Sequence, residues 1–282
     1  MISVVTPVYQ GRRFIESCIE TVVGQACSDV EHIIIDGGST DGTVEIVERN
    51  AERHPHIRWV SEKDKGQSDA LNKGITMARG EILAVLNVDD FYEPNVLNRI
   101  SEIFRTLPEP ALLAGNCNIW DDKGDLLQVN KPAKLMLSDL LSGYRANPWP
   151  VNPSAYFYHT SLHQQIGPYN VQDHYTMDVD FLLRAVQVAW VQYVDEVWGN
   201  FRLIKGTKTA VDTKRGDDDR RVKGLMKSYR KSLPLLERWK SAVQYEFYNT
   251  AMWRRVRHFV RKPHELLPAL LRKVLNSGSS PI

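Results

Sequence analysis

The sequence predicts an α/β fold in which a mostly parallel sheet has helices on both faces. Apolar segments of four or five residues alternate with helix-length segments between residues 2 and 106, and this alternation is typical of strands joined by crossover helices. The most polar segments of this region directly follow the apolar ones. Because ligands of such sheets bind outside the carboxyl ends of the strands, these polar segments are the candidate binding segments.

The individual elements follow from local patterns. The apolar segments 2–5, 31–35, 57–61 and 82–86 are expected strands, and the first is expected to stop at Thr6-Pro7. Helices are expected at 14–25, 43–53, 68–77 and 94–106. Later elements are a strand pair at 112–120 and 126–129 around the turn 122–125, strands at 155–158 and 191–194, and a helix at 177–188. Residues 1–95 and 96–210 are interpreted as two halves of one unit.

The composition is that of an ordinary globular protein. Of the 282 residues, 43% are hydrophobic and 25% are charged, and the formal net charge is only +2, so the overall charge indicates no particular partner. Cys18, Cys27 and Cys117 form no Cys-x-x-Cys pair, which argues against a disulfide framework and a structural zinc site. With neither a signal-peptide pattern nor an apolar run of membrane-spanning length, the chain is expected in the cytoplasm.

Residues 211–282 form a distinct extension, because this segment is basic and has the pattern of helices. Aromatic and basic residues interleave in it, as at Trp239 between Arg238 and Lys240, and at Trp253 before Arg254. Three interpretations are open: a surface that lies on anionic lipid, a patch that stacks nucleic-acid bases, and helices that pack on the preceding unit or on a second subunit. The pattern favours packing or lipid, and no nucleic-acid partner is expected.

Asp89 and Asp90 directly follow an apolar strand. Two adjacent carboxylates at such a place repel each other unless a cation neutralises them, and Mg²⁺ and Mn²⁺ prefer oxygen ligands and bridge carboxylates to substrate phosphates. The pair therefore predicts a divalent-cation site. The alternative is an ordinary solvated turn.

Two further polar segments suit a nucleotide. In segment 36–43 the glycines let the backbone approach a ligand, and Asp36 can accept hydrogen bonds from a base or ribose. In segment 61–74, Asp64 and Asp69 could bind the nucleoside, and Lys73 could offset phosphate charge. The alternatives are a capped strand–turn–helix connection and a solvated loop.

Segment 175–184 contains Asp178 and Asp180 at the start of a predicted helix. One of these carboxylates could act as a general base, which must lie within hydrogen-bond reach of the proton it removes. The alternative is a pair of acidic residues that complement the helix dipole.

In their order along the chain, these motifs resemble those of the family 2 glycosyltransferases. The motifs are Thr-Pro-Val-Tyr at 6–9, Ile-Asp-Gly-Gly-Ser-Thr-Asp-Gly-Thr at 35–43, Ser-Glu-Lys-Asp-Lys-Gly-Gln-Ser-Asp-Ala-Leu-Asn-Lys-Gly at 61–74, Leu-Asn-Val-Asp-Asp at 86–90 and Met-Asp-Val-Asp-Phe at 177–181. The resemblance implies a GT-A fold over residues 1–210, with a nucleotide-sugar-binding half at 1–95, an acceptor half at 96–210 and the helical extension at 211–282.

The resemblance also implies roles for individual residues. Thr6, Pro7, Tyr9, Asp36 and Asp64 would line the nucleoside pocket, Asp89 and Asp90 would hold Mn²⁺ or Mg²⁺, with Asp90 the more direct ligand, and Asp178 would be the catalytic base. Asn-Pro-Ser at 152–154 resembles an acceptor-side loop.

The implied activity is the transfer of a hexose or N-acetylhexosamine, with inversion, from a UDP-sugar to a saccharide or lipid-linked acceptor in the assembly of a bacterial surface polysaccharide. The implied location is the cytoplasm, at the inner face of the inner membrane through the basic extension, and a homodimer is an open alternative.

Three positions depart from the family pattern. Gly37 stands where many members have a second Asp, Met177 stands where many have Glu, and Ile204 stands where a terminal motif often has His. Without that His, Arg202, Lys205 and Lys208 are the candidates to face phosphate. The Ile204 departure leaves open a catalytically silent member that binds nucleotide sugars or a partner, and a nucleotidyltransferase, which would release pyrophosphate in place of UDP, is a further alternative.

Overall fold

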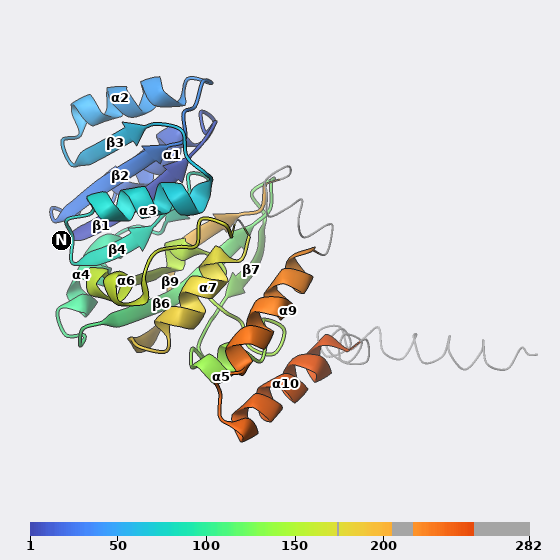
Figure 1. Cartoon of the computed structure of the whole chain (residues 1–282). Coiled ribbons are helices and arrows are strands. Elements are labelled where there is room, and N and C mark those ends of the chain that lie inside the picture. The colour runs from blue at the N-terminus through green and yellow to red at the C-terminus, as the bar shows by residue number, and fades with distance from the viewer. Residues whose placement is uncertain (174, 205–216, 251–282) are drawn as a thin grey trace, which may run out of the picture.

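The computed structural model describes residues 1–282 except 174, 205–216 and 251–282. Its centre is a nine-stranded sheet in the order β3-β2-β1-β4-β8-β6-β9-β5, with β7 paired to β6 (Figure 1). The sheet includes strands from both halves expected from the sequence, so the α/β class is confirmed and the two halves share one framework.

The first half is the parallel part of the sheet. It contains β1 (Ile2–Val8), β2 (Val30–Asp36), β3 (Ile57–Ser61) and β4 (Ile82–Val85), joined by α1 (Ile15–Val23), α2 (Thr43–Arg53) and α3 (Gln67–Met77). All neighbouring strands within this part run in parallel. Strands covered on both faces read as continuous apolar runs, which explains why these elements were predictable.

The second half mixes strand directions. Its elements are β5 (Phe91–Tyr92), α4 (Val96–Phe104), β6 (Ala111–Trp120), β7 (Leu126–Asn130), α5 (Leu137–Leu140), a 3₁₀ turn η1 (Pro153–Ala155), β8 (Tyr156–His159), α6 (Thr160–Ile166), α7 (Met177–Ala185) and β9 (Trp190–Arg202). β8 is antiparallel to both β4 and β6, whereas β6 and β9 are parallel. The sheet is therefore mixed, and its parallel character belongs mainly to the β3–β4 part.

Alternate strand residues point to opposite faces and build two layers of core. In β4, Leu83 and Val85 pack with residues of α3, α6 and α7, whereas Ile82 and Ala84 pack with α1 and α4. Helices thus cover both faces, as predicted, and α3 and α7 lie on the near face in Figure 1.

β1 and β9 extend furthest beyond their predicted bounds. β1 continues through Thr6 and Pro7 to Val8, because its pairing with β4 ends at Val5 while its pairing with β2 goes on. A proline is tolerated where one side of a strand has no partner. β9 was expected at 191–194 but extends to Arg202, since its second part pairs with both β6 and β5.

The C-terminal extension is helical over its described residues, in α9 (Asp217–Arg230) and α10 (Leu235–Asn249). Arg230 donates to the carbonyl of Leu141 at 2.6 Å, and its guanidinium lies 4.6 Å from the ring centroid of Tyr245. These contacts fix α9 and α10 against α5, at the end of the molecule away from β3 (Figure 1). No helix within the described residues is both long enough and apolar enough to cross a membrane.

Candidate active site

The carboxyl ends of β1, β2 and β4 meet at one edge of the sheet, and the predicted binding segments lie there. β1 pairs in parallel with both β2 and β4. Two of the following loops are joined directly: Gln10 N donates to Ser39 Oγ at 2.7 Å, and Gly11 N donates to Thr43 Oγ1 at 3.0 Å. The β1–α1 loop is thereby fastened to the β2–α2 loop.

The three nucleoside-pocket candidates of the first motif differ in exposure. Thr6 is fully buried and its hydroxyl lies 2.9 Å from His32 Nε2. Burial lowers the pKa of His32 to about 3, so this imidazole is neutral. Pro7 is buried too, whereas 65% of Tyr9 is exposed. Of these three side chains, Tyr9 is the one that a ligand can reach.

Asp36, at the end of β2, stabilises the turn that follows it. Its Oδ2 accepts hydrogen bonds from Gly38 N at 3.0 Å, Ser39 N at 2.9 Å and Ser61 Oγ at 2.7 Å. The other oxygen, Oδ1, is buried and has no hydrogen-bond partner in the described part of the chain. One oxygen of Asp36 therefore shapes the β2–α2 loop, and the other is left without a donor.

The loop before α3 contains Asp64 and is held by contacts of Asp69 and Lys73. Asp69 Oδ2 accepts from Lys65 N at 3.0 Å, and Lys73 Nζ lies 2.8 Å from Glu62 and 3.6 Å from Asp69. The hydrogen bond with Glu62 raises the pKa of Lys73. Asp69 and Lys73 thus stabilise this loop, which carries the half-buried Asp64.

Asp90 is buried just beyond β4, with 2% of its surface exposed. Its Oδ2 accepts from the side-chain amides of Asn87 at 3.0 Å and Asn152 at 2.7 Å, and its Oδ1 from Arg202 N at 3.3 Å. Burial, and then the charge of Asp89, raise the pKa of Asp90 to about 8. Burial also raises the pKa of Asp89, although Arg202 opposes that shift.

This carboxylate pair fits a divalent cation. Both groups resist ionisation where they lie, and a cation bound to them would stabilise their charged form. No group of three or more His, Cys, Asp or Glu side chains among the described residues could hold a metal. An ion held by Asp89 and Asp90 could complete its coordination with oxygens of a diphosphate.

Asn152 is a site residue that the sequence did not single out as a ligand. Its Oδ1 accepts from Ser154 N at 2.8 Å and caps η1, while its Nδ2 donates to Asp90. The available signal was the Asn-Pro-Ser motif at 152–154. Only the fold shows that this motif reaches the carboxylate pair, because β8, which follows it, is inserted directly beside β4.

Asp178 lies in the first turn of α7 and is half-buried. The first turn of α3 connects its surroundings to the carboxylate pair. Ser68 Oγ lies 2.8 Å from Met177 Sδ, and Gln67 Nε2 donates to Asn87 Oδ1 at 2.9 Å. The start of α3 is thus in contact with the start of α7 on one side and with the loop of Asp89 and Asp90 on the other.

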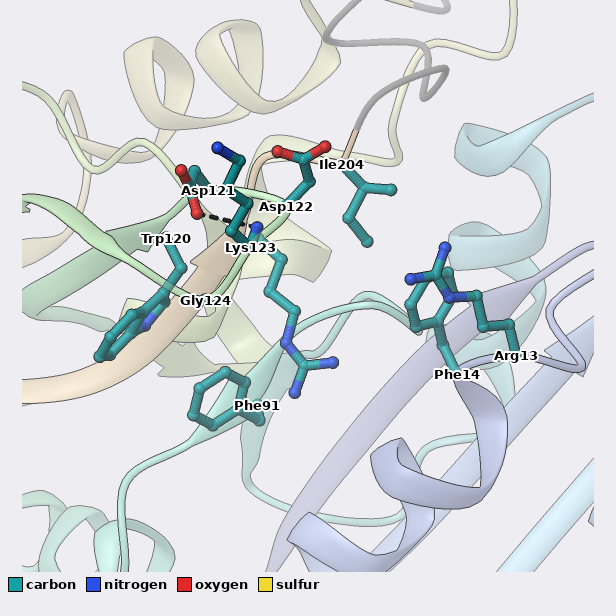
Figure 2. Close-up of a pocket in the computed structure, with 10 residues that line it drawn as sticks. Arg13, Phe14, Phe91, Trp120, Asp121, Asp122, Lys123, Gly124 and Ile204 are labelled. Atoms are coloured by element: carbon teal, nitrogen blue, oxygen red, sulfur yellow. Dashed lines mark hydrogen bonds between the residues drawn. The ribbon is translucent and has the colours of Figure 1, made fainter.

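A cavity of about 560 Å³ opens beside the carboxylate pair, within the size range of ligand pockets. Figure 2 shows Trp120 and Phe91 on one side of it and Phe14 with Arg13 on the other. Arg202 is the predicted site residue in its lining, and the Arg202 guanidinium lies 4.6 Å from the Phe91 ring centroid. The turn of the β6–β7 hairpin closes the cavity, at Asp121, Asp122, Lys123 and Gly124.

Ile204 also lines this cavity. An apolar side chain therefore lines the cavity at the position of the missing histidine. Lys205 and Lys208, the other phosphate-facing candidates, lie outside the described residues.

Comparison with known proteins gives one family. The model of glycosyl transferase family 2 matches residues 3–126. The chain is 26% identical over 223 residues to chondroitin synthase of Escherichia coli, an alignment that covers 75% of this chain and 30% of that protein. The chain spans about a third of the length of this chondroitin synthase and of two further curated relatives that it matches.

Solved structures share the fold. TarS of S. aureus, residues 1–349 in complex with UDP-GlcNAc, superposes with a TM-score of 0.66 at 15% identity, covering 88% of this chain and 72% of that one. The mannosyltransferase PcManGT of Pyrobaculum calidifontis, in complex with GDP-Man and Mn²⁺, superposes with a TM-score of 0.65 at 18% identity, covering 100% and 76%. The GT-A-type fold expected from the sequence is confirmed.

Proposed function

The chain belongs to the family 2 glycosyltransferases, and from this premise we propose that it transfers a sugar, with inversion, from a nucleotide-sugar donor to a saccharide or lipid-linked acceptor. One observation carries the proposal. Half-buried Asp89 and buried Asp90 lie at the same sheet edge as the Asp36 turn. The first turn of α3 contacts both their loop and the start of α7, where Asp178 lies. Groups suited to bind a nucleoside, to bind a diphosphate and to accept a proton are thus neighbours.

The proposed donor is a UDP-sugar that carries a hexose or N-acetylhexosamine. The fold neighbour TarS has been solved with UDP-GlcNAc, which supports a uridine nucleotide as donor. PcManGT has been solved with GDP-Man, so the binding experiment below includes GDP as the alternative. The nucleoside would lie against Tyr9 and Asp64, the exposed and half-exposed candidates at this edge.

The diphosphate would lie at the carboxylate pair. Mn²⁺ or Mg²⁺ held by Asp89 and Asp90 would neutralise the charge of the leaving diphosphate. Asn87 and Asn152 orient Asp90 by donating to the same oxygen. The guanidinium of Arg202, stacked on Phe91, supplies a fixed positive charge beside the pair.

Asp178 would act as the base. Its carboxylate accepts the proton of the acceptor hydroxyl, and the hydroxyl oxygen attacks the anomeric carbon on the face opposite the diphosphate, which inverts the configuration. The position of Asp178 at the helix N-terminus holds its charged form next to the positive end of the dipole.

We also propose that α10 lies on anionic lipid, which suits a lipid-linked acceptor. The outer stripe of α10 is apolar, with exposed fractions from 43% to 78% at Leu235, Leu236, Trp239, Val243 and Phe247, while its inner face buries Ser241 and Tyr245. Exposed Lys231 and Lys240 flank the stripe. The sequence that follows, 251–282, contains seven Lys and Arg residues against one Glu. Aromatic and aliphatic side chains among basic residues are typical of an interfacial helix.

Binding of nucleotides tests the donor site. The purified chain is heated with UDP, GDP or CDP, each with Mn²⁺ or EDTA, and a ligand at a hundred times its dissociation constant adds about 2.7 kcal/mol of stability. We expect stabilisation by UDP that depends on Mn²⁺, and release of UDP, not pyrophosphate, when a UDP-sugar and acceptor are supplied. Binding without any transfer would favour the catalytically silent member, and no stabilisation by any nucleotide contradicts the proposed function.

A further inference from the structure

The Asp64 carboxylate fills the space that a side chain at position 37 would occupy. A Cβ atom built on Gly37 would lie 2.5 Å from Asp64 Oδ2, closer than real atoms approach, and 3.4 Å from Cδ2 of Tyr9. Gly37 also lacks the left-handed φ of Gly38 (+86°) and Gly42 (+97°). A side chain at position 37 would therefore have to displace the Asp64 carboxylate, although the backbone of Gly37 would itself accept one.

The surroundings of Asp64 aim one oxygen at this space. Its Oδ1 accepts from Gly66 N at 2.8 Å, which fixes the carboxylate in the loop before α3. Its Oδ2 is the atom that a side chain at 37 would meet. The neighbouring Asp36 cannot take over this position, because its Oδ2 serves three donors of its own turn and its Oδ1 is buried.

We propose that Gly37 is a specificity-determining residue of the donor site, because its missing side chain assigns recognition of the nucleobase to Asp64. The inference rests on the proposed function. One carboxylate fits beside Tyr9, and it can be supplied from position 37 or from position 64, but not from both.

The chemistry of the base follows from a carboxylate at this place. A carboxylate is only an acceptor, so it pairs with a ring N–H such as that of uracil. Cytosine presents a bare ring nitrogen at the same position, and two acceptors repel each other. The assignment therefore favours uridine over cytidine nucleotides.

The test relocates the carboxylate. UDP and CDP affinities are measured by calorimetry in the presence of Mn²⁺ for the wild type, Asp64→Ala, Gly37→Asp and the double variant Gly37→Asp/Asp64→Ala. We expect Asp64→Ala to weaken UDP binding about 10- to 100-fold, the effect of losing a hydrogen bond to a charged group. The double variant recovers most of the lost affinity, and Gly37→Asp alone does not match the wild type, because two carboxylates then compete for one space.

Two further variants sharpen the result. Asp64→Asn keeps the shape but adds an N–H donor, so it narrows or inverts the preference for UDP over CDP. Glu52→Ala removes an exposed carboxylate in the last turn of α2 and leaves UDP affinity unchanged. Thermal unfolding of every variant checks that the fold is retained.

Each outcome decides between the claims. Wild-type affinity in Asp64→Ala, or a double variant that binds no better than Asp64→Ala, overturns the assignment and leaves the proposed function standing. Stronger binding of GDP than of UDP that still depends on Asp64 supports the assignment and overturns the uridine donor. A wild type that binds no nucleotide overturns both.

Discussion

Asp178 and Asp180 share one turn of α7, yet their surroundings differ. Asp180 accepts from Arg184 Nε at 2.9 Å and from Tyr229 Oη at 2.7 Å, which joins α7 to α9. Asp178 lies near Tyr156, whose pKa is raised by burial and then by the charge of Asp178. The structure thus gives Asp180 a structural role and is consistent with a proton-accepting role for Asp178.

Replacing each of the two carboxylates separates these roles. Asp178→Asn is expected to lower kcat by about 10²- to 10⁴-fold, the contribution of a general base, while the Kd for UDP is unchanged. Asp180→Asn is expected to lower the free energy of unfolding by about 1 kcal/mol, because a charged hydrogen-bond acceptor is lost. Turnover of the Asp178 variant near the wild-type value, measured with saturating donor and acceptor, would rule out the base assignment.

The raised pKa of Asp90 predicts a dependence of stability on pH. The folded pKa of about 8 lies above the unfolded value near 4, so the folded state binds more protons between these pH values. Without divalent cations, the free energy of unfolding should therefore fall as pH rises from 4 to 8, by at most about 1.4 kcal/mol per pH unit.

Chemical denaturation at pH 5 and pH 8, in EDTA or Mn²⁺, measures this dependence. Asp90→Asn should be less sensitive to pH in EDTA than the wild type, and Mn²⁺ should stabilise the wild type at pH 8 but not the variant. If the variant kept the full Mn²⁺ effect, Asp90 would not be a ligand.

The sequence predicted where the acidic candidates lie in the fold, but not which groups they contact. Asp36, Asp89 and Asp90 follow apolar strands, and the ends of parallel strands meet at one edge whatever the detailed packing. Thr6 was expected to line a pocket, but its side chain points into the core toward His32. The sequence pattern of a strand does not show to which side a given side chain points at the end of the strand. The contact of Asn152 with Asp90 joins residues 62 positions apart and depends on the path of the whole chain.

Among the elements, β9 shows why a strand can be missed. Its second part contains Asp195, Glu196 and Asn200, which interrupt the apolar pattern. The fold satisfies each of them: Lys131 lies 2.8 Å from Asp195, and Arg99 lies 2.9 Å from Glu196, while Asn200 accepts from Trp120 Nε1 at 2.8 Å. Its pairing with β5 and β6, and polar partners from elements distant in sequence, make this segment a strand and place Arg202 at Asp90.

Helix α10 carries the prediction about lipid. The wild type should sediment with vesicles that contain anionic lipid and not with neutral ones, and added salt should weaken the binding because charge is screened. Leu236→Ser/Trp239→Ser should lower the partition coefficient at least about tenfold, since burial of a large apolar side chain contributes about 1.5–3 kcal/mol.

The matched control for α10 is Leu126→Ser/Leu127→Ser, which removes two exposed leucines of β7 and should leave vesicle binding unchanged. Equal loss in both variants would indicate nonspecific adsorption. Concentration-dependent dimers that the α10 variant abolishes, without any vesicle binding, would instead assign the stripe to a second copy of the chain.

At the scale of the whole molecule, the candidate site contains residues from both halves. The parallel part supplies Asp64, Asp89 and Asp90, and the mixed part supplies Asn152, Asp178 and Arg202. The parallel part could be predicted because each strand and its crossover helix are close in sequence. The mixed part could not, because β6, β8 and β9 pair over long sequence separations and in an order that differs from their order along the chain.

The insertion of β8 between β4 and β6 bears on any attempt to divide the chain. A fragment that stops near residue 95 retains β4 but loses the strand that covers it. β4 then becomes a bare edge of four buried apolar residues, Ile82–Val85. Such edges recruit strands of other molecules and lead to aggregation. The two halves can be told apart by their motifs, but their strands form one sheet, so we expect that the chain has to be expressed intact.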